Sequence, residues 1–314
     1  MMKIGCVCLD TSHPKSMATK MEADCMDMRF EYLWDKGFRL ESEREWFVNR
    51  FGLKGQVDEI KDMVDKVDIG FILSCNWEKH LDMAMPFIEA GKPVFLDKPM
   101  VGTVKDIQKV RQLIANGATI YGSSSCRYCP EVQAFKKESV ETRGEVLSIF
   151  CTVGTDEFNY AIHVMEIMSE IAGAKAVSSQ FVGYGREVNG MKVEMYNVQF
   201  ENGIRGTYHL TVGKHQHFHM TVSTTKGIRY YHLDPNGFLI SLLRELYRQW
   251  RYGKSILTDM ETILNCSEAM LCCKKSRDER GGAEVSISEL TEDDKFDGYA
   301  FEQEYGAAAG VAYK

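Results

Sequence analysis

The sequence predicts an α/β protein in which a doubly wound parallel sheet precedes an α+β domain with a large, mainly antiparallel sheet. Residues 1–121 alternate short apolar strand patterns with helix patterns, which is typical of parallel sheets. After a serine-rich loop at 123–125, strand patterns dominate and alternate apolar with polar residues, as in an antiparallel sheet with one covered face. We therefore expect two domains, at 1–121 and 122–314.

The elements of the first domain follow from short apolar runs and from helical spacing. Each expected strand is a run of the kind found in strands buried on both faces of a parallel sheet. Strands are expected at 4–9, 30–34, 68–73 and 119–121, with a further short strand centred on Phe95. Helices are expected at 14–24, 41–51, 57–64, 77–90 and 104–115.

The second domain is expected to contain six strands and four helices. Its strands are expected at 145–153, 176–184, 191–200, 204–212, 217–223 and 228–233. Its helices are expected at 130–139, 160–172, 238–251 and 259–274. Residues 291–314 are acidic and then rich in Gly and Ala, which predicts a loosely packed tail.

Composition excludes several classes of protein. The net charge of −7 and the pI of about 5.7 differ from the basic charge that nucleic-acid-binding proteins carry. No apolar run reaches membrane-spanning length, and the chain enters a strand pattern at Lys3 with no signal-peptide pattern before it. Ten cysteines at irregular spacing indicate reduced thiols. We expect a cytoplasmic protein with no nucleic-acid or membrane partner.

A lysine stands at the carboxyl end of the short strand centred on Phe95. Ligands of open α/β sheets bind outside the carboxyl ends of the strands, and Asp97 and Lys98 occupy that end. Pro99 restricts Lys98 to extended geometry. Because partial burial lowers the pKa of a lysine, Lys98 can share a proton with a bound hydroxyl. The alternative is a surface lysine at a strand-to-loop junction.

An acidic residue stands where a dinucleotide-binding sheet needs one. Such a sheet places a diphosphate at its first strand-to-helix turn and an acid about 20 residues further on, for the ribose. Asp35 fits the position of the acid and favours NAD over NADP. Lys36, next to it, and Arg39 weaken that preference, so NADP stays an alternative.

The first strand-to-helix turn departs from the glycine-rich pattern. Residues 8–13 read Cys-Leu-Asp-Thr-Ser-His, so that side chains block the closest backbone approach and Asp10 repels phosphate. Thr11, Ser12 and His13 can donate hydrogen bonds in place of glycine amides, and a helix N-terminus attracts phosphate. The alternative is a plain helix cap formed by Thr11 or Ser12.

A polar stripe runs along the expected helix at 160–172. His163, Glu166 and Glu170 share one face, with Asn159 just before them, while the remaining surface is mostly apolar. A histidine titrates near neutrality and can act as a general base, and Glu166, one turn on, can orient its ring. The alternative is a core histidine satisfied by a carboxylate.

A second histidine group lies at His215, His217 and His219, with His209 nearby. Alternation along a strand would place three of these rings on one face, but no carboxylate or cysteine completes a metal-ligand set. The Cys-x-x-Cys pair at 126–129 has no second pair at zinc-binding spacing. We expect no metal, and a metal-dependent enzyme that uses the histidines is the alternative.

Several motifs in order resemble the Gfo/Idh/MocA family of sugar and polyol oxidoreductases. Asp97-Lys98-Pro99 looks like the family's Glu-Lys-Pro. Ser74-Cys75-Asn76-Trp77-Glu78-Lys79-His80 is similar to the loop before that motif, with Asn76 and His80 in the matching places. Arg127 and Pro130 match a further turn, and His163 falls where the family has its catalytic histidine.

The resemblance implies a Rossmann-type NAD-binding domain followed by a substrate domain, and hydride transfer between a carbinol carbon and nicotinamide. Lys98 and His163 would handle the hydroxyl proton, with Arg127 and Asn159 at the substrate and a small carbohydrate-like molecule as substrate. The cofactor would contact the first turn, the end of the second strand, and the loops at Ser74, Cys75, Asn76, His80, Asp97 and Lys98. Relatives pair through the second sheet, which implies a homodimer or homotetramer.

Two departures from the family pattern motivate an alternative. The glycine pattern is missing, and the family's aspartate four residues before the histidine is Asn159 here. A relative that has lost redox chemistry and acts as a ligand sensor or partner-binding subunit is therefore the second hypothesis. A member that uses tightly held NAD for a net non-redox reaction, such as a sugar lyase or epimerase, is a further one.

Overall fold

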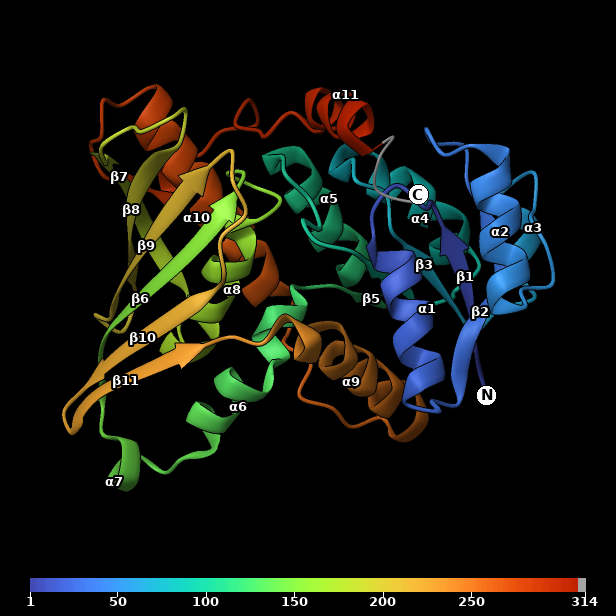
Figure 1. Cartoon of the computed structure of the whole chain (residues 1–314), viewed down its shortest axis with the longest axis horizontal. Helices are drawn as coiled ribbons and strands as arrows, with labels where there is room; N and C mark the ends of the chain where they lie inside the picture. Colours follow the sequence, from blue (N-terminus) through green and yellow to red (C-terminus); the bar gives the residue numbers. More distant parts are fainter. Residues whose placement is uncertain (310–314) are drawn as a thin grey trace. The chain divides into compact units, whose positions relative to one another are not determined.

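The computed structural model describes residues 1–309 and divides the chain into two compact units (Figure 1). The first unit comprises residues 1–123, 243–260 and the chain from 297 onward. The second unit comprises residues 124–242 and 261–296. Each unit is described by itself. Within residues 1–309, the helices are all too short or too polar to span a membrane.

The first unit is built on a five-stranded parallel sheet, as predicted. Its strands lie in the order β2-β1-β3-β4-β5. Their bounds are β1 (Met2–Val7), β2 (Met28–Trp34), β3 (Ile69–Ile72), β4 (Val94–Leu96) and β5 (Ile120–Tyr121). The chain order reverses between β1 and β3, so ligands of such a sheet bind outside the carboxyl ends of these two strands.

Helices pack closely on this sheet. They are α1 (His13–Ala23), α2 (Glu41–Phe51), α3 (Lys61–Val64), η1 (Trp77–Lys79), α4 (His80–Glu89) and α5 (Val104–Ala115). The contact between α4 and β3 depends on Gly70, because a Cβ there would lie 2.7 Å from the ring of Phe87. Phe30, Phe71 and Phe95 pack edge-on or tilted along the sheet with ring centroids 5.0–6.0 Å apart.

Two later segments belong to the first unit. Helix α9 (Phe238–Tyr252) has most of its length there, and Arg244 pairs with Asp24 at the end of α1 at 2.7 Å. Helix α11 (Gly298–Ala309) packs by its first turns on η1. The prediction of a loosely packed tail is therefore wrong for residues 298–309, where apolar and aromatic side chains anchor a helix despite its Gly/Ala-rich sequence.

The second unit contains a seven-stranded sheet, mainly antiparallel as predicted. The strand order is β11-β10-β6-β9-β8-β7-β12, and only the β6–β9 pair is parallel within the described residues. The bounds are β6 (Val146–Thr155), β7 (Ala176–Tyr184), β8 (Lys192–Phe200), β9 (Arg205–Val212), β10 (His219–Thr224), β11 (Gly227–His232) and β12 (Val285–Ser286). The two-residue β12 is the strand that sequence patterns did not reveal.

Helices of the second unit bury the apolar face of this sheet. They are η2 (Ser125–Tyr128), α6 (Pro130–Lys137), α7 (Val140–Arg143), α8 (Ala161–Ala172), η3 (Pro235–Gly237), α10 (Met260–Asp278) and η4 (Ile287–Glu289). Helix α8 contacts β6 and β9 and is buried on nearly every side. Gly206 of β9 permits this contact, because a Cβ there would lie 2.7 Å from the sulfur of Met168.

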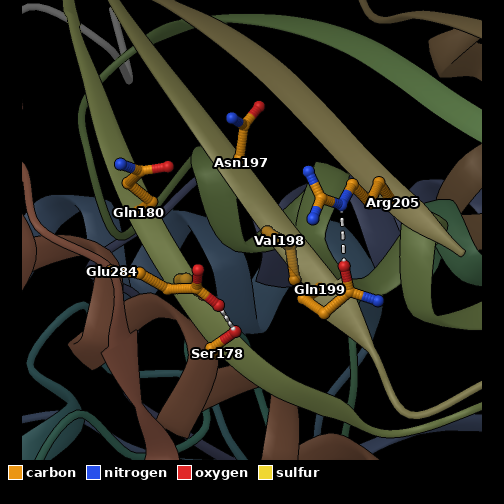
Figure 2. Close-up of a pocket in the computed structure, with 8 residues that line it drawn as sticks. Ser178, Gln180, Asn197, Val198, Gln199, Arg205 and Glu284 are labelled. Carbon is orange, nitrogen blue, oxygen red and sulfur yellow. Dashed lines mark hydrogen bonds between the residues drawn. The ribbon is translucent and has the colours of Figure 1, made fainter. Parts of the chain in front are cut away.

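Polar side chains gather on part of the opposite face of β7, β8 and β9. Figure 2 shows a shallow depression there, of about 30 Å³, with Gln180 and Asn197 at its rim. Arg205 donates to Gln199 at 2.9 Å, and Ser178 donates to Glu284. This volume holds about one water molecule, so the depression offers no room for a larger ligand.

Candidate functional site

The turn after β1 keeps the backbone shape of a dinucleotide-binding turn without its glycines. Cys8 adopts a left-handed conformation, with φ of +74°, at the place of the first glycine. The guanidinium of buried Arg39 donates to the carbonyls of Leu9 and Asp10, at 3.0 and 2.7 Å. The turn is therefore held by a buried arginine, which sequence reasoning considered only for cofactor preference.

Asp10 is buried beneath this turn, with 1% of its surface exposed. Its Oδ2 accepts hydrogen bonds from the Ser74 hydroxyl at 2.9 Å and from the Cys75 amide at 3.1 Å. Its Oδ1 has no hydrogen-bond partner. Burial raises the pKa of Asp10 above its ordinary value, although these two donors act to lower it. The predicted site residues Asp10, Ser74 and Cys75 therefore lie together, in contact with one another.

Asp35 follows the end of β2 and reaches the same turn. Its Oδ1 accepts from the amides of Leu9 at 3.3 Å and Gly37 at 3.4 Å, while Oδ2 has no hydrogen bond and lies 3.7 Å from the guanidinium of Arg44. Burial, and then the nearby Asp10, raise the pKa of Asp35. Ligand atoms of Asp35, Asp10 and Cys8 lie within 4.8 Å of one another. The end of β2 therefore carries an unsatisfied carboxylate oxygen.

The residues that open α1 lie at the same edge of the sheet. The hydroxyl of Thr11 accepts from the amide of His13 at 3.1 Å, while Ser12 is exposed. The His13 ring Nδ1 lies 2.5 Å from Asp97 Oδ2, which joins the start of α1 to the end of β4. Burial acts to raise the pKa of Asp97, but His13 and then Lys98 outweigh it, and this pKa is lowered. Lys98 beside it is half-buried and precedes a cis bond to Pro99.

The loop after β3 positions Asn76 and His80. The Asn76 side chain accepts from the amide of Glu78 at 3.0 Å and so begins η1. His80 is fully buried. Its Nδ1 lies 2.9 Å from the carbonyl oxygen of Met100, and its Nε2 lies 2.9 Å from the carbonyl oxygen of Ser74. His80 therefore joins this loop to the segment after β4, and its role at the ligand stays a prediction.

One residue at this edge of the first unit, Glu302, was not predicted from the sequence. Glu302 of α11 lies at this edge, where its carboxylate accepts from Lys79 Nζ at 2.6 and 2.7 Å and from Asn76 Nδ2 at 3.0 Å. The residues lie more than 220 positions apart in the sequence, and nothing in the pattern around Glu302 links it to the loop after β3.

His163 of α8 is the centre of the candidate site in the second unit. Its Nδ1 lies 2.5 Å from the hydroxyl of Ser124, and the rings of Tyr160 and Phe218 lie edge-on to it. Only 6% of its surface is exposed. Both oxygens of Glu166 accept hydrogen bonds from other groups, and its role in orienting the His163 ring stays a prediction. The Ser124 hydroxyl is a contact of the ring that the sequence did not predict.

Glu166 and Arg127 form a buried ionic network. Arg127 is 1% exposed, and it donates to Glu166 at 3.0 Å and to Glu170 at 2.7 Å. The second oxygen of Glu166 accepts from the Ser124 amide at 2.8 Å. Burial acts to lower the pKa of Arg127, but the two carboxylates raise it. The guanidinium of Arg127 is therefore paired with carboxylates in this structure, and its role at the substrate stays a prediction.

Asn159 precedes α8, as expected, and contacts a carboxylate that the sequence analysis overlooked. Its side-chain amide donates to Asp156 at 3.2 Å, and Asp156 also accepts from the amide of Tyr160 at 3.1 Å. A carboxylate is therefore available beside Asn159, three residues before the position where the family has its aspartate. Lys98 belongs to the first unit and His163 to the second.

The histidine group of the second unit is spread over three strands and a loop. His219 Nε2 and His232 Nδ1 lie 3.0 Å apart, and the His217 ring is 5.3 Å from that of His232. His215 instead contacts Tyr160, and His209 packs on Phe150. Within residues 1–309, the group that could supply three metal ligands is the one formed by Cys8, Asp10 and Asp35.

Comparison with known proteins identifies the first unit. Residues 19–122 match the model of an oxidoreductase family with an NAD-binding Rossmann fold, named GFO_IDH_MocA. Over these residues the chain is similar to the NAD-binding domain of that family. The match confirms the resemblance noted from the motifs, and it begins after the glycine-free turn. No curated protein matches the chain by sequence.

Solved structures share the fold of the chain at low sequence identity. Scyllo-inositol dehydrogenase from Lactobacillus casei, with bound NAD(H) and scyllo-inositol, is 16% identical with a TM-score of 0.78, and the match covers 92% of this chain and 100% of that one. Myo-inositol dehydrogenase from the same organism, in complex with NAD(H) and myo-inositol, is 12% identical with a TM-score of 0.77, covering 93% and 98%. A probable dehydrogenase from Thermotoga maritima is 15% identical with a TM-score of 0.74, covering 92% and 100%.

Proposed function

We propose that this protein is an NAD-dependent oxidoreductase that acts on a polyol, a sugar or a related hydroxy compound. The observation that carries the proposal is the unsatisfied carboxylate of Asp35 at the end of β2, in a domain similar to the NAD-binding domain of the Gfo/Idh/MocA family. A carboxylate at this position accepts hydrogen bonds from ribose hydroxyls. The solved inositol dehydrogenases support a polyhydroxylated ring as the substrate class.

The residues of the first unit fit a dinucleotide, with side chains in place of glycine amides. Asp35 Oδ2 is buried without a hydrogen-bond partner, and it is the group that would accept from a ribose hydroxyl. Cys8, in the turn beside it, has a left-handed conformation. Thr11, Ser12 and His13 open α1, where a phosphate is stabilised by the helix N-terminus. When bound, the nicotinamide ring supplies the acceptor or donor of a hydride.

The charges around Asp35 favour NAD over NADP. A carboxylate here repels a 2′-phosphate. Lys36, next to Asp35 in the sequence, is ion-paired with Glu59 at 3.0 Å, and Arg39 is committed to backbone carbonyls. Arg44, whose guanidinium lies beside Asp35 Oδ2, is ion-paired with Glu41 at 2.5 Å. The side-chain cations that could pair with the 2′-phosphate of NADP therefore already bind other groups of the chain.

Lys98 and His163 are proposed to handle the proton of the reacting hydroxyl. The ammonium of Lys98, half-buried at the end of β4, polarises the substrate oxygen. His163 accepts or returns the proton, with its ring held by Ser124, and Asn159 with Asp156 contacts the substrate hydroxyls. These roles use one residue group from each unit.

The experiment measures NADH formation when the purified protein is mixed with NAD and a panel of inositols and sugars. We expect turnover of at least one polyol, and a loss of about 10²–10⁴-fold in kcat for Lys98→Ala and for His163→Ala. Lys105→Ala, an exposed lysine on α5, is the matched control and retains turnover. Full activity of both site variants on an identified substrate would contradict the assigned roles.

A second candidate function is a redox-inactive ligand sensor or partner-binding subunit. The glycine-free turn favours it, because buried Asp10 places a carboxylate where a diphosphate would approach. Calorimetry with NAD and NADH distinguishes the two, since micromolar binding supports the oxidoreductase and no binding at millimolar ligand supports the sensor. Retention of NAD without net NADH formation would instead support a lyase or epimerase.

The assembly and the compartment are part of the same proposal. The strand alternation of the second sheet leaves one face for self-association, and we propose a homodimer or homotetramer. All ten cysteines are free thiols, which supports a reducing, cytoplasmic compartment. A monomeric mass from solution scattering would contradict the oligomer.

A further inference from the structure

Two departures from the family pattern contact each other in the first unit. His13 stands where the third glycine of the dinucleotide pattern would fall, and Asp97 is one carbon shorter than the glutamate of Glu-Lys-Pro. These residues are 84 positions apart in the sequence, and His13 Nδ1 lies 2.5 Å from Asp97 Oδ2. β3 lies between β1 and β4 in the sheet, so the contact spans the carboxyl end of β3. The two changes therefore act at one place, on the edge of the sheet where a dinucleotide would bind.

Asp97 is a buried carboxylate that remains ionised. Its side chain is 3% exposed, and the His13 side chain is 19% exposed. Burial acts to raise the pKa of Asp97, but His13 and then Lys98 outweigh it and lower this pKa. A buried charge needs an opposite charge beside it, and an ionised carboxylate stabilises the imidazolium form of a histidine that donates to it. Asp97 therefore orients the His13 ring and supports a positive charge on it.

The backbone at the start of α1 offers few donors to a phosphate. The amide of His13 donates to the Thr11 hydroxyl at 3.1 Å, and Pro14 has no N–H group. Lys15, in the same turn of the helix, lies over the ring of Trp46, 5.2 Å from its centroid. A diphosphate at this turn therefore needs a side-chain donor.

Two buried carboxylates lie beneath the turn that would hold the diphosphate. Burial, and then the charge of Asp10, raise the pKa of Asp35, because the two carboxylates lie close together. The cations Arg44 and Lys79 are each paired with a glutamate. The other charged and titratable groups that act on these residues are Cys8, Glu41, Cys75, Lys98 and Glu302. A diphosphate here meets two like charges, which a charged His13 offsets.

We propose that His13, oriented and charged by Asp97, replaces glycine amides as the donor to the diphosphate of NAD(H), so that cofactor binding requires a proton on His13. The Nδ1–H donates to Asp97, and the Nε2–H donates to a phosphate oxygen in a charge-assisted hydrogen bond. When the ring loses a proton while Nδ1–H stays on Asp97, the donor to the phosphate is lost. Asp97 is a positioning residue. The inference rests on the proposed function for the dinucleotide.

The experiment is calorimetry of NADH binding to the full-length protein at about pH 6 and about pH 8, because histidines titrate within this range. We expect the affinity of the wild type to fall about tenfold from the lower to the higher pH. His13→Gln keeps a donor for Asp97 but carries no charge, so it should bind weakly at both pH values. His13→Arg stays charged and should keep the tighter affinity at pH 8. His217→Gln, an exposed histidine of the second unit, is the matched control and should keep the wild-type pH dependence.

Asp97→Asn separates positioning of the charge from a merely structural role. This variant keeps the size of the side chain but removes its charge, so the fall in affinity should move to lower pH. An equal loss of affinity at both pH values would show a structural role only and would overturn the assignment of Asp97. A pH dependence that persists in His13→Gln would belong to another group, such as Asp10, and would overturn the proposal, as would a wild-type affinity that does not change with pH.

Pyrophosphate at about pH 6 is the second probe, because the donor to the diphosphate needs no nicotinamide. If NADH does not bind to any variant, but pyrophosphate binds to the wild type and His13→Arg and not to His13→Gln, the proposed function fails and this inference stands. If NADH binds equally to all variants at both pH values, the proposed function stands and this inference fails. If neither probe binds to any variant, both fail.

Discussion

The Nδ1 of His163 lies 2.5 Å from the hydroxyl oxygen of Ser124, and the amide of the same serine donates to Glu166. One serine therefore connects the imidazole of α8 to the buried ionic network around Arg127. The His163 ring is held by the Ser124 hydroxyl. The carboxylate of Glu166, one turn further along α8, accepts a hydrogen bond from the backbone amide of Ser124. The orientation of the candidate base depends on a loop residue outside the polar stripe of the helix.

Replacing Ser124 with alanine is expected to lower kcat by about tenfold, since a general base loses efficiency when its ring is no longer oriented. The measurement is the pH dependence of kcat/KM, in which the apparent pKa of the base should move. Ser223→Ala, on β10 of the same unit, is the control. An unchanged kcat and an unchanged pH profile in Ser124→Ala would show that Ser124 does not orient the His163 ring for catalysis.

Replacing Arg127 with alanine is expected to destabilise the protein by about 3–5 kcal/mol, because Glu166 and Glu170 would be left as buried carboxylates without their main partner. Lys136→Ala removes the partly exposed partner of Glu170 and is expected to cost about 0–1 kcal/mol. Urea unfolding measures both. Equal losses in the free energy of unfolding for the two substitutions would show that burial of the ionic network contributes little to stability.

Burial raises the pKa of Glu157 to about 7, although the neighbouring Arg277 acts to lower it. Since the unfolded chain releases this proton near its ordinary pKa of 4.5, folding stability is fully present below that pH and declines as the pH rises toward 7. The decline amounts to about 3 kcal/mol. Glu157→Gln should remove this part of the pH dependence. Parallel stability curves for variant and wild type between pH 4.5 and 7 would contradict the prediction.

Replacing Gly298 with alanine is expected to loosen α11, because the new Cβ would lie 2.3 Å from the side-chain oxygen of Asn76. Faster amide exchange over residues 298–309 should follow. Ala300→Ser changes an exposed position of the same helix and should not alter the exchange. If Gly298→Ala leaves exchange unchanged, the close approach of helix and loop is not needed for docking.

Local sequence patterns predicted most of the helices and strands. The strand at β4 and the helix at α8 were expected close to their observed bounds, because an apolar run and a helical stripe each reflect burial of their own residues. The positions of Asp10, Asp35 and Asp97 at the strand ends follow from the same topology. Short elements such as β12 carry too few residues to show a period.

What the sequence determined by itself is the parallel sheet, its Gfo/Idh/MocA motifs and the strand-end placement of the candidate residues, since periodicity and chain order are local properties. Only the tertiary structure decided which polar groups meet: Ser124 with His163, Arg127 with Glu166, and Glu302 with Lys79. These partners lie 39, 39 and 223 residues apart. Hydrogen bonds and ion pairs depend on distances of a few ångströms, and such distances between remote residues arise only once the apolar faces have packed.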